Sequence, residues 1–213
     1  VNIAGGLCYY IWDKNYSGEC CIKNYGDDNV LNRNLNEFEI FVRNNKAVTI
    51  IRKICKSKKE NLNQFVKKDV YFAIRNYFGI ASFERGTDKD KTGDNIILIS
   101  SQGKGFYPIK KISDRGKVVS KYKTIITYAM SGGNKPSSEG NYQIVSSLQV
   151  LNKNEVCTET YLVLGAFDSN SEAENLKSYI ATKFSRFLLL QALTSIHITR
   201  DSFIFVPLDR KST

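Results

Sequence analysis

The chain has 213 residues, of which 42% are hydrophobic, and this is enough for one large domain or two small ones around a hydrophobic core. No run of 18 apolar residues occurs, so we expect no membrane-spanning helix, and the first residues lack the basic and apolar blocks of a secretion signal. The net charge of +10 favours an anionic partner, nucleic acid before a membrane surface, over a generally basic exterior.

The cysteines indicate a reducing compartment. They are five in number and scattered, the adjacent pair Cys20 and Cys21 does not have the Cys-x-x-Cys spacing, and the chain has one histidine. This pattern argues against a disulfide scaffold and against a structural zinc site. We therefore expect free thiols in a cytoplasmic protein.

The first third of the chain predicts a hairpin followed by a helix. Two apolar runs, LCYYIW (7–12) and ECCIKNY (19–25), flank a turn-rich hexapeptide, which is typical of a β-hairpin. EFEIFV (37–42) alternates apolar and acidic residues, like a strand with one wet face or a short helix end. Residues 44–66 carry an apolar face with helical spacing among many lysines and predict a helix.

The middle of the chain is rich in predicted strands. Residues 70–86 are short, aromatic and broken by glycines, and the pattern leaves their structure open. SGGNKPSSEGN (131–141) predicts a long loop. The runs with strand composition lie at 95–100, 106–112, 123–130, 142–150 and 156–167.

The end of the chain predicts one long helix and an extended tail. Ser171 and Glu174 have the spacing of a capping box, and residues 171–191 carry one apolar stripe at three- and four-residue steps. The tail RDSFIFVPL (200–208) follows. Many strands with one helix early and one late predict an α+β fold, built on a curved, partly closed β-sheet.

The sequence offers no catalytic constellation. No Glu is followed two residues later by Lys, as a restriction-type metal-dependent nuclease requires. The one histidine, His197, lies between two isoleucines. This position favours a structural role over that of a general base that activates a Ser or Cys nucleophile. No phosphate-binding glycine motif is complete. The pattern favours a binding module, with no catalytic residue, no cofactor site and no metal site assigned.

Four stretches interleave basic residues with turn-forming residues or aromatic residues. Glycine lets backbone N–H groups approach phosphates, lysine and arginine neutralise charge, and Gln, Asn and Arg can bind base edges. Together with the net charge, these stretches predict binding to nucleic acid. They lie at 84–86, 102–111, 119–123 and 131–135.

Two terminal segments resemble a known enzyme family. Residues 1–20 resemble the Gly-Gly-Val-Cys-Tyr-Phe-Leu-Trp-Asp run near the end of the catalytic domain of type II N6-adenine DNA methyltransferases, including fused restriction–modification enzymes. CTETYLVLGAF and the following helix (157–190), with the tail DSFIFVPL (201–208), resemble the close of their target recognition domain. IRNYFGI (74–80) and VSKYKTIITYAM (119–130) match looser family patterns.

The resemblance implies a division of the chain and of its function. Residues 1–43 would be the end of the methyltransferase catalytic fold, a remnant β-hairpin of its α/β core, with 7–12 as a late strand of its sheet. Residues 44–213 would be the DNA target recognition domain. The S-adenosyl-L-methionine loop and the Asn-Pro-Pro-Tyr motif of the family are absent from this sequence. The implied function of this chain is therefore recognition of a sequence in double-stranded DNA. The implied parent enzyme uses S-adenosyl-L-methionine, and the sequence leaves open whether it also cleaves DNA.

The DNA-binding residues are expected on the basic stretches. In place of a Lys that family members often carry after the Lys-Tyr-Lys strand, this chain has Tyr128, which leaves the base-reading roles open. Phosphate contacts are expected from Lys104, Lys110, Lys121, Lys123 and Lys135. Base-edge contacts are expected from Arg75, Arg85, Gln102 and Asn134.

Alternatives from other classes stay open at this point. One is the DNA specificity subunit of a multisubunit restriction–modification system, which carries the same kind of domain. Another is an unrelated basic binding module, or an unrelated enzyme whose pocket the sequence does not reveal. An in-frame Asn-Pro-Pro-Tyr motif upstream would favour the methyltransferase, and a thermal-shift screen against cofactors would expose the unrelated enzyme.

Overall fold

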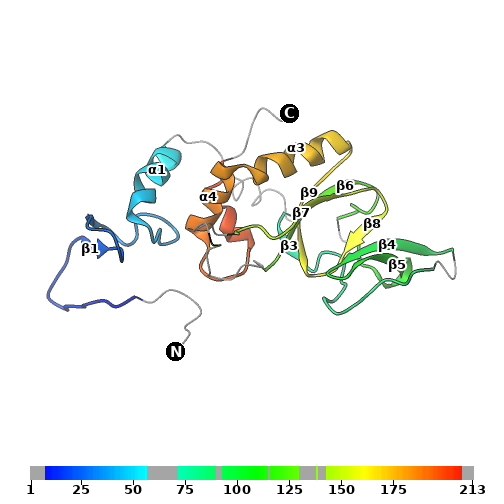
Figure 1. The fold of residues 1–213 in the computed structure, drawn as a ribbon, viewed down its shortest axis with the longest axis horizontal. Helices are drawn as coiled ribbons and strands as arrows, with labels where there is room; N and C mark the ends of the chain where they lie inside the picture. The colour runs from blue at the N-terminus through cyan, green and yellow to red at the C-terminus, as the bar shows by residue number, and fades with distance from the viewer. Residues whose placement is uncertain are drawn as a thin grey trace.

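The computed structural model describes residues 8–56, 72–89, 93–114, 116–129, 138 and 143–207. Within them the chain forms a mixed α+β structure with three α-helices and three separate sheets, none of which is closed (Figure 1). The α+β class expected from the sequence is therefore confirmed, whereas the curved, partly closed sheet stays a prediction.

The N-terminal hairpin differs from the predicted one. β1 (Cys20–Lys23) pairs antiparallel with β2 (Val30–Arg33), and the described residues of the run 7–12 form no strand. The turn that joins β1 to β2 contains Gly26 with φ of 75°, a conformation that glycine adopts at no steric cost. Tyr9 to Trp12 are exposed and pair with no strand of the described part of the chain, so apolar composition alone did not make this run a partner for β1.

The segment after β2 leads into the first helix. EFEIFV (37–42) is neither strand nor helix, yet Phe38, Ile40 and Val42 pack inward. α1 (Asn45–Lys56) matches the start of the predicted helix, and the rest of that prediction lies outside the described residues. Its inward face, Ala47, Val48 and Ile51, is buried as the helical spacing requires.

The centre of the molecule is a four-stranded antiparallel sheet. Its strand order is β3 (Ile74–Arg75), β9 (Tyr161–Phe167), β6 (Tyr122–Thr127) and β7 (Leu148–Leu151). The predicted strands at 123–130, 142–150 and 156–167 all contribute, although each true strand is shorter. Tyr161 to Phe167 form β9 alone, because the preceding residues belong to another strand and a turn.

A second sheet lies on one face of the central sheet. It has the order β5 (Gly103–Pro108), β4 (Asn95–Ser100) and β8 (Glu155–Cys157), with β8 parallel to β4. The predicted strand 95–100 is confirmed. The strand predicted at 106–112 begins earlier and ends at Pro108, where the short 3₁₀ helix η1 (Ile109–Lys111) follows.

The predicted long C-terminal helix is two helices. α3 (Asn170–Ala181) and α4 (Lys183–Ala192) are separated at Thr182, whose ψ of 149° is extended rather than helical. Thr182 instead caps α4 by accepting a hydrogen bond from the Ser185 N–H. The capping box also differs from the prediction, since Ser169 and Glu172 form it two residues earlier than expected.

The predicted extended tail is partly helical. Its first residues form the 3₁₀ helix η2 (Arg200–Phe203), and Phe203, Phe205 and Val206 are buried. Packing of these side chains against the helices favours the tight turn over an extended strand. The last residue of the predicted tail, Leu208, lies outside the described residues.

Two hydrophobic clusters lie on opposite faces of the central sheet. α3 and α4 cover one face, where Ile126, Leu162 and Leu164 point, and the second sheet covers the other, where Ile125 and Val163 point (Figure 1). This alternation follows from the two-residue period of a strand. Neighbouring residues of one strand thus serve two different cores.

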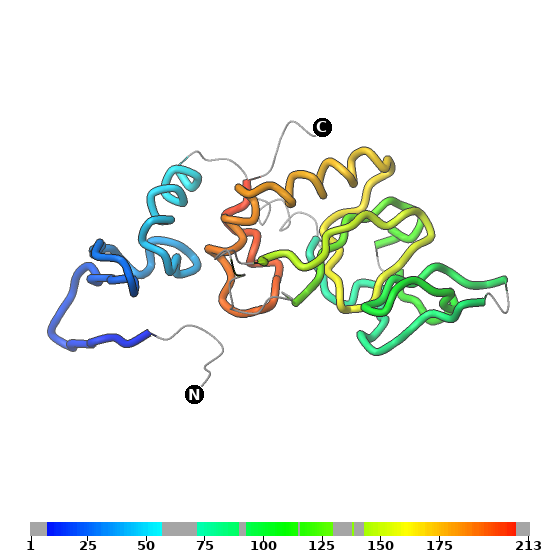
Figure 2. Tube along the Cα trace, in the orientation of Figure 1, coloured from blue at the N-terminus to red at the C-terminus, as the bar shows by residue number. Residues whose placement is uncertain are grey.

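The first cluster extends across the expected domain boundary at 43/44. Val42 and the inward face of α1 belong to the same cluster as α4 and η2. The Arg43 Nη2 donates to the Leu193 carbonyl at 2.7 Å and strengthens this junction. In Figure 2 α1 lies between the N-terminal hairpin and the remainder of the chain. The packing is therefore continuous here, and a division of function at residue 43 stays a prediction.

Candidate nucleic-acid interface

The turn between β8 and β9, residues 158–160, joins several distant segments and is named here the Glu159 turn. The Thr158 N–H donates to Ile99 at the end of β4 at 3.1 Å, and the Glu159 N–H donates to Ile80 at 2.9 Å. The Thr160 carbonyl accepts from the Tyr128 N–H at 2.8 Å. Backbone bonds thus fix the ends of β4 and β6 and the segment after β3 around one short turn.

Arg75 lies on β3 beside this turn. Its Nε donates to the Glu159 carbonyl at 3.4 Å, and its Nη2 lies 3.5 Å from Glu159 Oε2. The guanidinium carbon lies 4.3 Å from the centre of the Tyr128 ring, within cation–π range. The side chain is nevertheless 48% exposed, so part of its donor edge faces solvent.

Tyr128 continues this cluster of flat groups to His197. The two rings stack with centroids 4.4 Å apart and an interplanar angle of 14°. Ala129 and His197 form an isolated antiparallel bridge, which brings the end of β6 against a segment some 70 residues later. The sequence predicts Tyr128 as a departure from a family pattern and His197 as a structural residue. It does not predict that the two rings meet, because a bridge between distant segments leaves no local signal.

Arg85 lies in the loop before β4 and is held by its own backbone. Its Nη1 donates to the carbonyls of Ser82 and Glu84, both at 2.6 Å. The Ser82 N–H in turn donates to Glu159 Oε1 at 3.2 Å, which ties this loop to the Glu159 turn. Phe83, which the sequence reasoning missed, is 78% exposed on the same loop and presents an aromatic face to solvent.

Gln102 lies at the tip of the two-residue turn between β4 and β5. Its backbone N–H donates to Ser100 Oγ at 3.3 Å, and its side chain is exposed. The Tyr161 hydroxyl donates to the Ser100 carbonyl at 3.5 Å, so this tip adjoins the start of β9. Of the four expected base-edge residues, Arg75 therefore contacts the Glu159 turn directly, whereas Arg85 is linked to it through Ser82 and Gln102 is linked to Tyr161 through Ser100.

The expected phosphate contacts are more dispersed. Lys104 pairs with Glu155 at 2.9 Å across the second sheet, and Lys121 pairs with Asp168 at 3.4 Å beyond the far end of β9. Lys110 lies on η1, which is at the opposite end of the β4–β5 hairpin from Gln102, about 20 Å along the strands. These lysines do not gather at one place. Asn134 and Lys135 lie outside the described residues.

Lys123 is not on the surface. The residue is fully buried, and its ammonium donates to the carbonyls of Val118, Val119, Lys121 and Asn152 at 2.7–3.3 Å. Burial lowers the pKa of Lys123 to about 8, so the group still carries its proton at neutral pH. The charge stabilises the converging carbonyls inside the protein. The prediction that Lys123 contacts a phosphate is therefore wrong, because a buried ammonium cannot reach DNA.

The glycines of two basic stretches also have an internal role. A Cβ added to Gly105 would lie 2.7 Å from the carbonyl carbon of Gly86, closer than real Cβ contacts allow. The loop before β4 crosses β5 at this point, and Thr87 bridges to Phe106 in the adjacent position. Both glycines are therefore required for close packing of two backbone segments. The sequence pattern explains them differently, by the approach of a phosphate.

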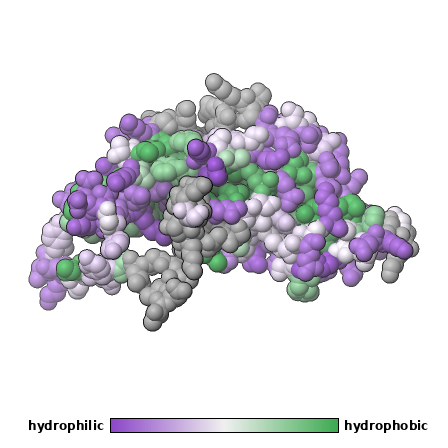
Figure 3. All heavy atoms as spheres, in the orientation of Figure 1, coloured by the Kyte–Doolittle hydropathy of each residue, from purple (hydrophilic) through white to green (hydrophobic). Residues whose placement is uncertain are grey.

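Tyr107 fixes the same crossing from inside. Its hydroxyl donates to a Glu84 carboxylate oxygen, and burial together with this hydrogen bond raises the pKa of Tyr107 to about 12. Glu84 and Arg85 are consequently held in a rigid loop. On the face shown in Figure 3, hydrophilic residues are spread over most of the coloured surface, so hydropathy alone does not single out one site there.

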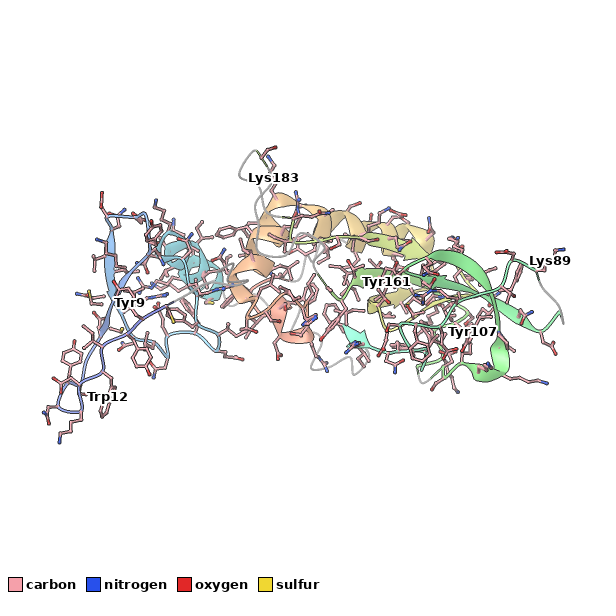
Figure 4. The ribbon with its side chains drawn as sticks, turned by 60° about the horizontal axis from the view of Figure 1, so that its bottom comes forward. Tyr9, Trp12, Lys89, Tyr107, Tyr161 and Lys183 are labelled. Carbon is pink, nitrogen blue, oxygen red and sulfur yellow. The ribbon has the colours of Figure 1, made fainter. Side chains whose placement is uncertain are left out.

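A separate feature is the aromatic segment at the start of the described chain. Tyr9, Tyr10, Ile11 and Trp12 are 75–95% exposed and belong to no strand. Figure 4 shows Tyr9 and Trp12 at the end of the molecule opposite Tyr107. Exposed apolar segments of this size on soluble proteins are typical of contact surfaces.

The described residues provide no group of three or more His, Cys, Asp and Glu side chains placed to hold a metal ion. In this part of the chain, no helix has the length and apolar character to cross a membrane. No protein-family model matches the chain, and searches of curated proteins and of solved structures found no match either.

Proposed function

We propose that this chain recognises a sequence in double-stranded DNA, as part of an N6-adenine DNA methyltransferase or a combined restriction–modification enzyme. The observation that carries the proposal is that Arg75 contacts the Glu159 turn and that the loops of Arg85 and Gln102 are tied by hydrogen bonds to this turn or to the adjacent Tyr161. They come from separate segments of the chain, and all three carry donors that match base edges. A binding surface is expected to unite such residues, whereas unrelated surface residues have no reason to converge.

The chemistry of this surface suits base recognition. Arginine can donate two hydrogen bonds to the N7 and O6 of guanine, and glutamine can bind adenine in the same bidentate manner. Exposed Phe83 adds a flat apolar face beside Arg85. Lys104, Lys110 and Lys121 remain accessible for the phosphate backbone, which determines register and supplies affinity independent of sequence.

The parent enzyme would supply the chemistry from residues that this sequence does not contain. By the resemblance, its catalytic domain binds S-adenosyl-L-methionine and extrudes the target adenine from the duplex. We expect the exposed segment Tyr9–Trp12 to contact that domain, since nothing among the described residues covers it. The site of action in this proposal is the cytoplasm.

The proposal is tested by binding measurements on the 213-residue chain. Fluorescence anisotropy with a labelled duplex should give an affinity that falls with salt, with a slope of log K against log salt of roughly −3 to −4 if three to four lysines contact phosphates. A selection from randomised duplexes should then enrich a defined sequence. A slope near zero together with no enriched sequence would overturn the proposal.

A calorimetric titration separates this chain from a complete enzyme. Because the cofactor loop and the Asn-Pro-Pro-Tyr motif are absent from the sequence, S-adenosyl-L-methionine should give no heat of binding to this chain. Micromolar binding of the cofactor would contradict the assignment of the chain to target recognition.

A further inference from the structure

Glu159 is the centre of the proposed interface although it carries the charge that DNA repels. Its backbone N–H donates to Ile80, and its Oε1 accepts from the Ser82 N–H at 3.2 Å. The carboxylate is therefore fixed by the segment 80–82 and is only 23% exposed. Its other oxygen, and its own carbonyl, face the Arg75 guanidinium.

Arg75 is consequently held on two sides. Glu159 engages the Nε and Nη2 groups, and the Tyr128 ring lies 4.3 Å from the guanidinium carbon. A guanidinium has five N–H groups, so donors remain after these contacts. A fork that is already oriented loses less conformational entropy when it binds a base edge, which favours a site built in this way.

The pairing also limits what Arg75 can do for general affinity. A neighbouring carboxylate offsets the charge of the guanidinium, so the pair attracts phosphates weakly. A directed hydrogen bond to a base edge depends on orientation rather than on net charge. The contacts of Glu159 thus weaken Arg75 as a phosphate contact and keep it suited to base recognition.

We propose that Glu159 is a positioning residue for base recognition, which holds Arg75 against Tyr128 so that its remaining donors bind a guanine in duplex DNA. This inference rests on the proposed function. It assigns to Glu159 a share of the sequence discrimination although Glu159 itself contacts no base.

The test compares Glu159→Gln with Glu159→Asp, Arg75→Ala and the matched control Glu174→Gln. Glu174 pairs with Lys177 at 2.9 Å on α3, so its change to Gln removes the same charge from an ion pair away from the Glu159 turn. Each variant of the 213-residue chain is titrated with the duplex enriched by wild type and with duplexes that replace each guanine in turn. Urea unfolding of each variant reports its stability.

Arg75→Ala should lower discrimination at one guanine by about 5- to 150-fold. Glu159→Gln should reduce discrimination at that same guanine by about 5- to 10-fold, with little change for the substituted duplex, because a misoriented fork makes a weaker bidentate contact. Glu159→Asp should restore part of the discrimination, and Glu174→Gln should leave it unchanged.

A purely structural Glu159 would give a different result. Glu159→Gln would then weaken binding to all duplexes alike, or lower only the unfolding midpoint, while Arg75→Ala still lost discrimination; this outcome overturns the positioning role and leaves the proposed function standing. If wild type itself shows no preference among duplexes, the proposed function fails, and this inference fails with it.

Discussion

The start of β6 and the Glu159 turn use positive charge in opposite ways. The sequence predicts a DNA contact for one cation at each place, Lys123 on β6 and Arg75 on β3 beside the Glu159 turn. At the start of β6 the Lys123 ammonium points inward to four carbonyls and is fully buried. At the Glu159 turn the Arg75 side chain is 48% exposed, and its guanidinium is held by one carboxylate and one aromatic ring.

The difference arises from what surrounds each cation. At the start of β6 four backbone carbonyls converge on one point, although those of Val118, Val119 and Asn152 also accept a backbone N–H. A buried cation donates to their remaining lone pairs and offsets the repulsion between the like-charged oxygens. Lys121, two residues before Lys123, projects instead toward Asp168 and remains accessible. A basic stretch can therefore contain structural and functional cations side by side, and only their burial distinguishes them.

The largest expected effect is the loss of the buried ammonium. Lys123→Met keeps the aliphatic stem but removes the charged donor from four carbonyls, three of which keep a backbone N–H, and this should lower the free energy of unfolding by about 2–3 kcal/mol. Lys121→Met is the matched control and should stay within about 0.5 kcal/mol of wild type. Urea unfolding followed by circular dichroism measures both, and equal stabilities of the two variants would remove the distinction between the two lysines.

The close contact between Gly86 and Gly105 allows a similar test, of whether a glycine in a basic stretch serves internal packing or DNA binding. Gly105→Ala places a Cβ against Gly86 and should cost about 1–3 kcal/mol of stability because the crossing strands must separate. Gly26→Ala is the comparison, since no atom lies within 4 Å of its added Cβ and only its φ of 75° opposes the change, at about 1 kcal/mol. If Gly105→Ala instead keeps full stability and loses only DNA binding, the glycine serves the approach of a phosphate.

A smaller effect is expected for the accessible lysine. Lys121→Ala should weaken binding to all duplexes alike and reduce the salt slope by about one, because one released counterion is lost. Asp168→Asn frees the Lys121 ammonium from its partner and should strengthen binding slightly at low salt. Salt-dependent fluorescence anisotropy distinguishes these outcomes, and a change in the preferred base on Lys121→Ala would instead assign it to base recognition.

The smallest effect concerns reactivity rather than stability. Cys157 is buried between the two sheets, and burial raises the pKa of its thiol to about 12, so it should react with a thiol reagent only when the protein unfolds. Cys8, Cys21 and Cys55 are exposed and should react in the native state. All five thiols should be titrated in denaturant without reductant. Fast reaction of Cys157 in native protein would indicate that the core between the sheets opens readily.

Periodicity along the sequence predicted several elements well. The strand at 95–100 has the expected bounds, and α1 begins where its apolar face begins. In the central sheet β9 lies within its predicted run, β6 and β7 overlap theirs, and β3 comes from a segment that the pattern left open. Thr182 was not predicted as a break, because the apolar stripe continues through both helices in the sequence. The hairpin was misplaced because LCYYIW has strand composition but no partner in this chain segment.

The candidate site was predicted only as a set of residue types. The chemistry of Arg75, Arg85 and Gln102 could be named from the sequence, because donors that match base edges are few. Their common location could not, since it depends on backbone bonds from the Glu159 turn to Ile80, Ile99 and Tyr128. Phe83 and Glu159 carried no local signal for the same reason.

The sequence by itself determined the α+β composition, the positive charge and the alternation that lets one strand serve two cores, since these depend on residue types and their spacing along the chain. The tertiary structure alone decided which cations are buried, where the C-terminal helix breaks and which side chains meet at the Glu159 turn. Those properties depend on contacts between residues far apart in the chain, such as Arg75 with Glu159 and Ala129 with His197. Burial, and with it the role of each charged group, is a property of these long-range contacts.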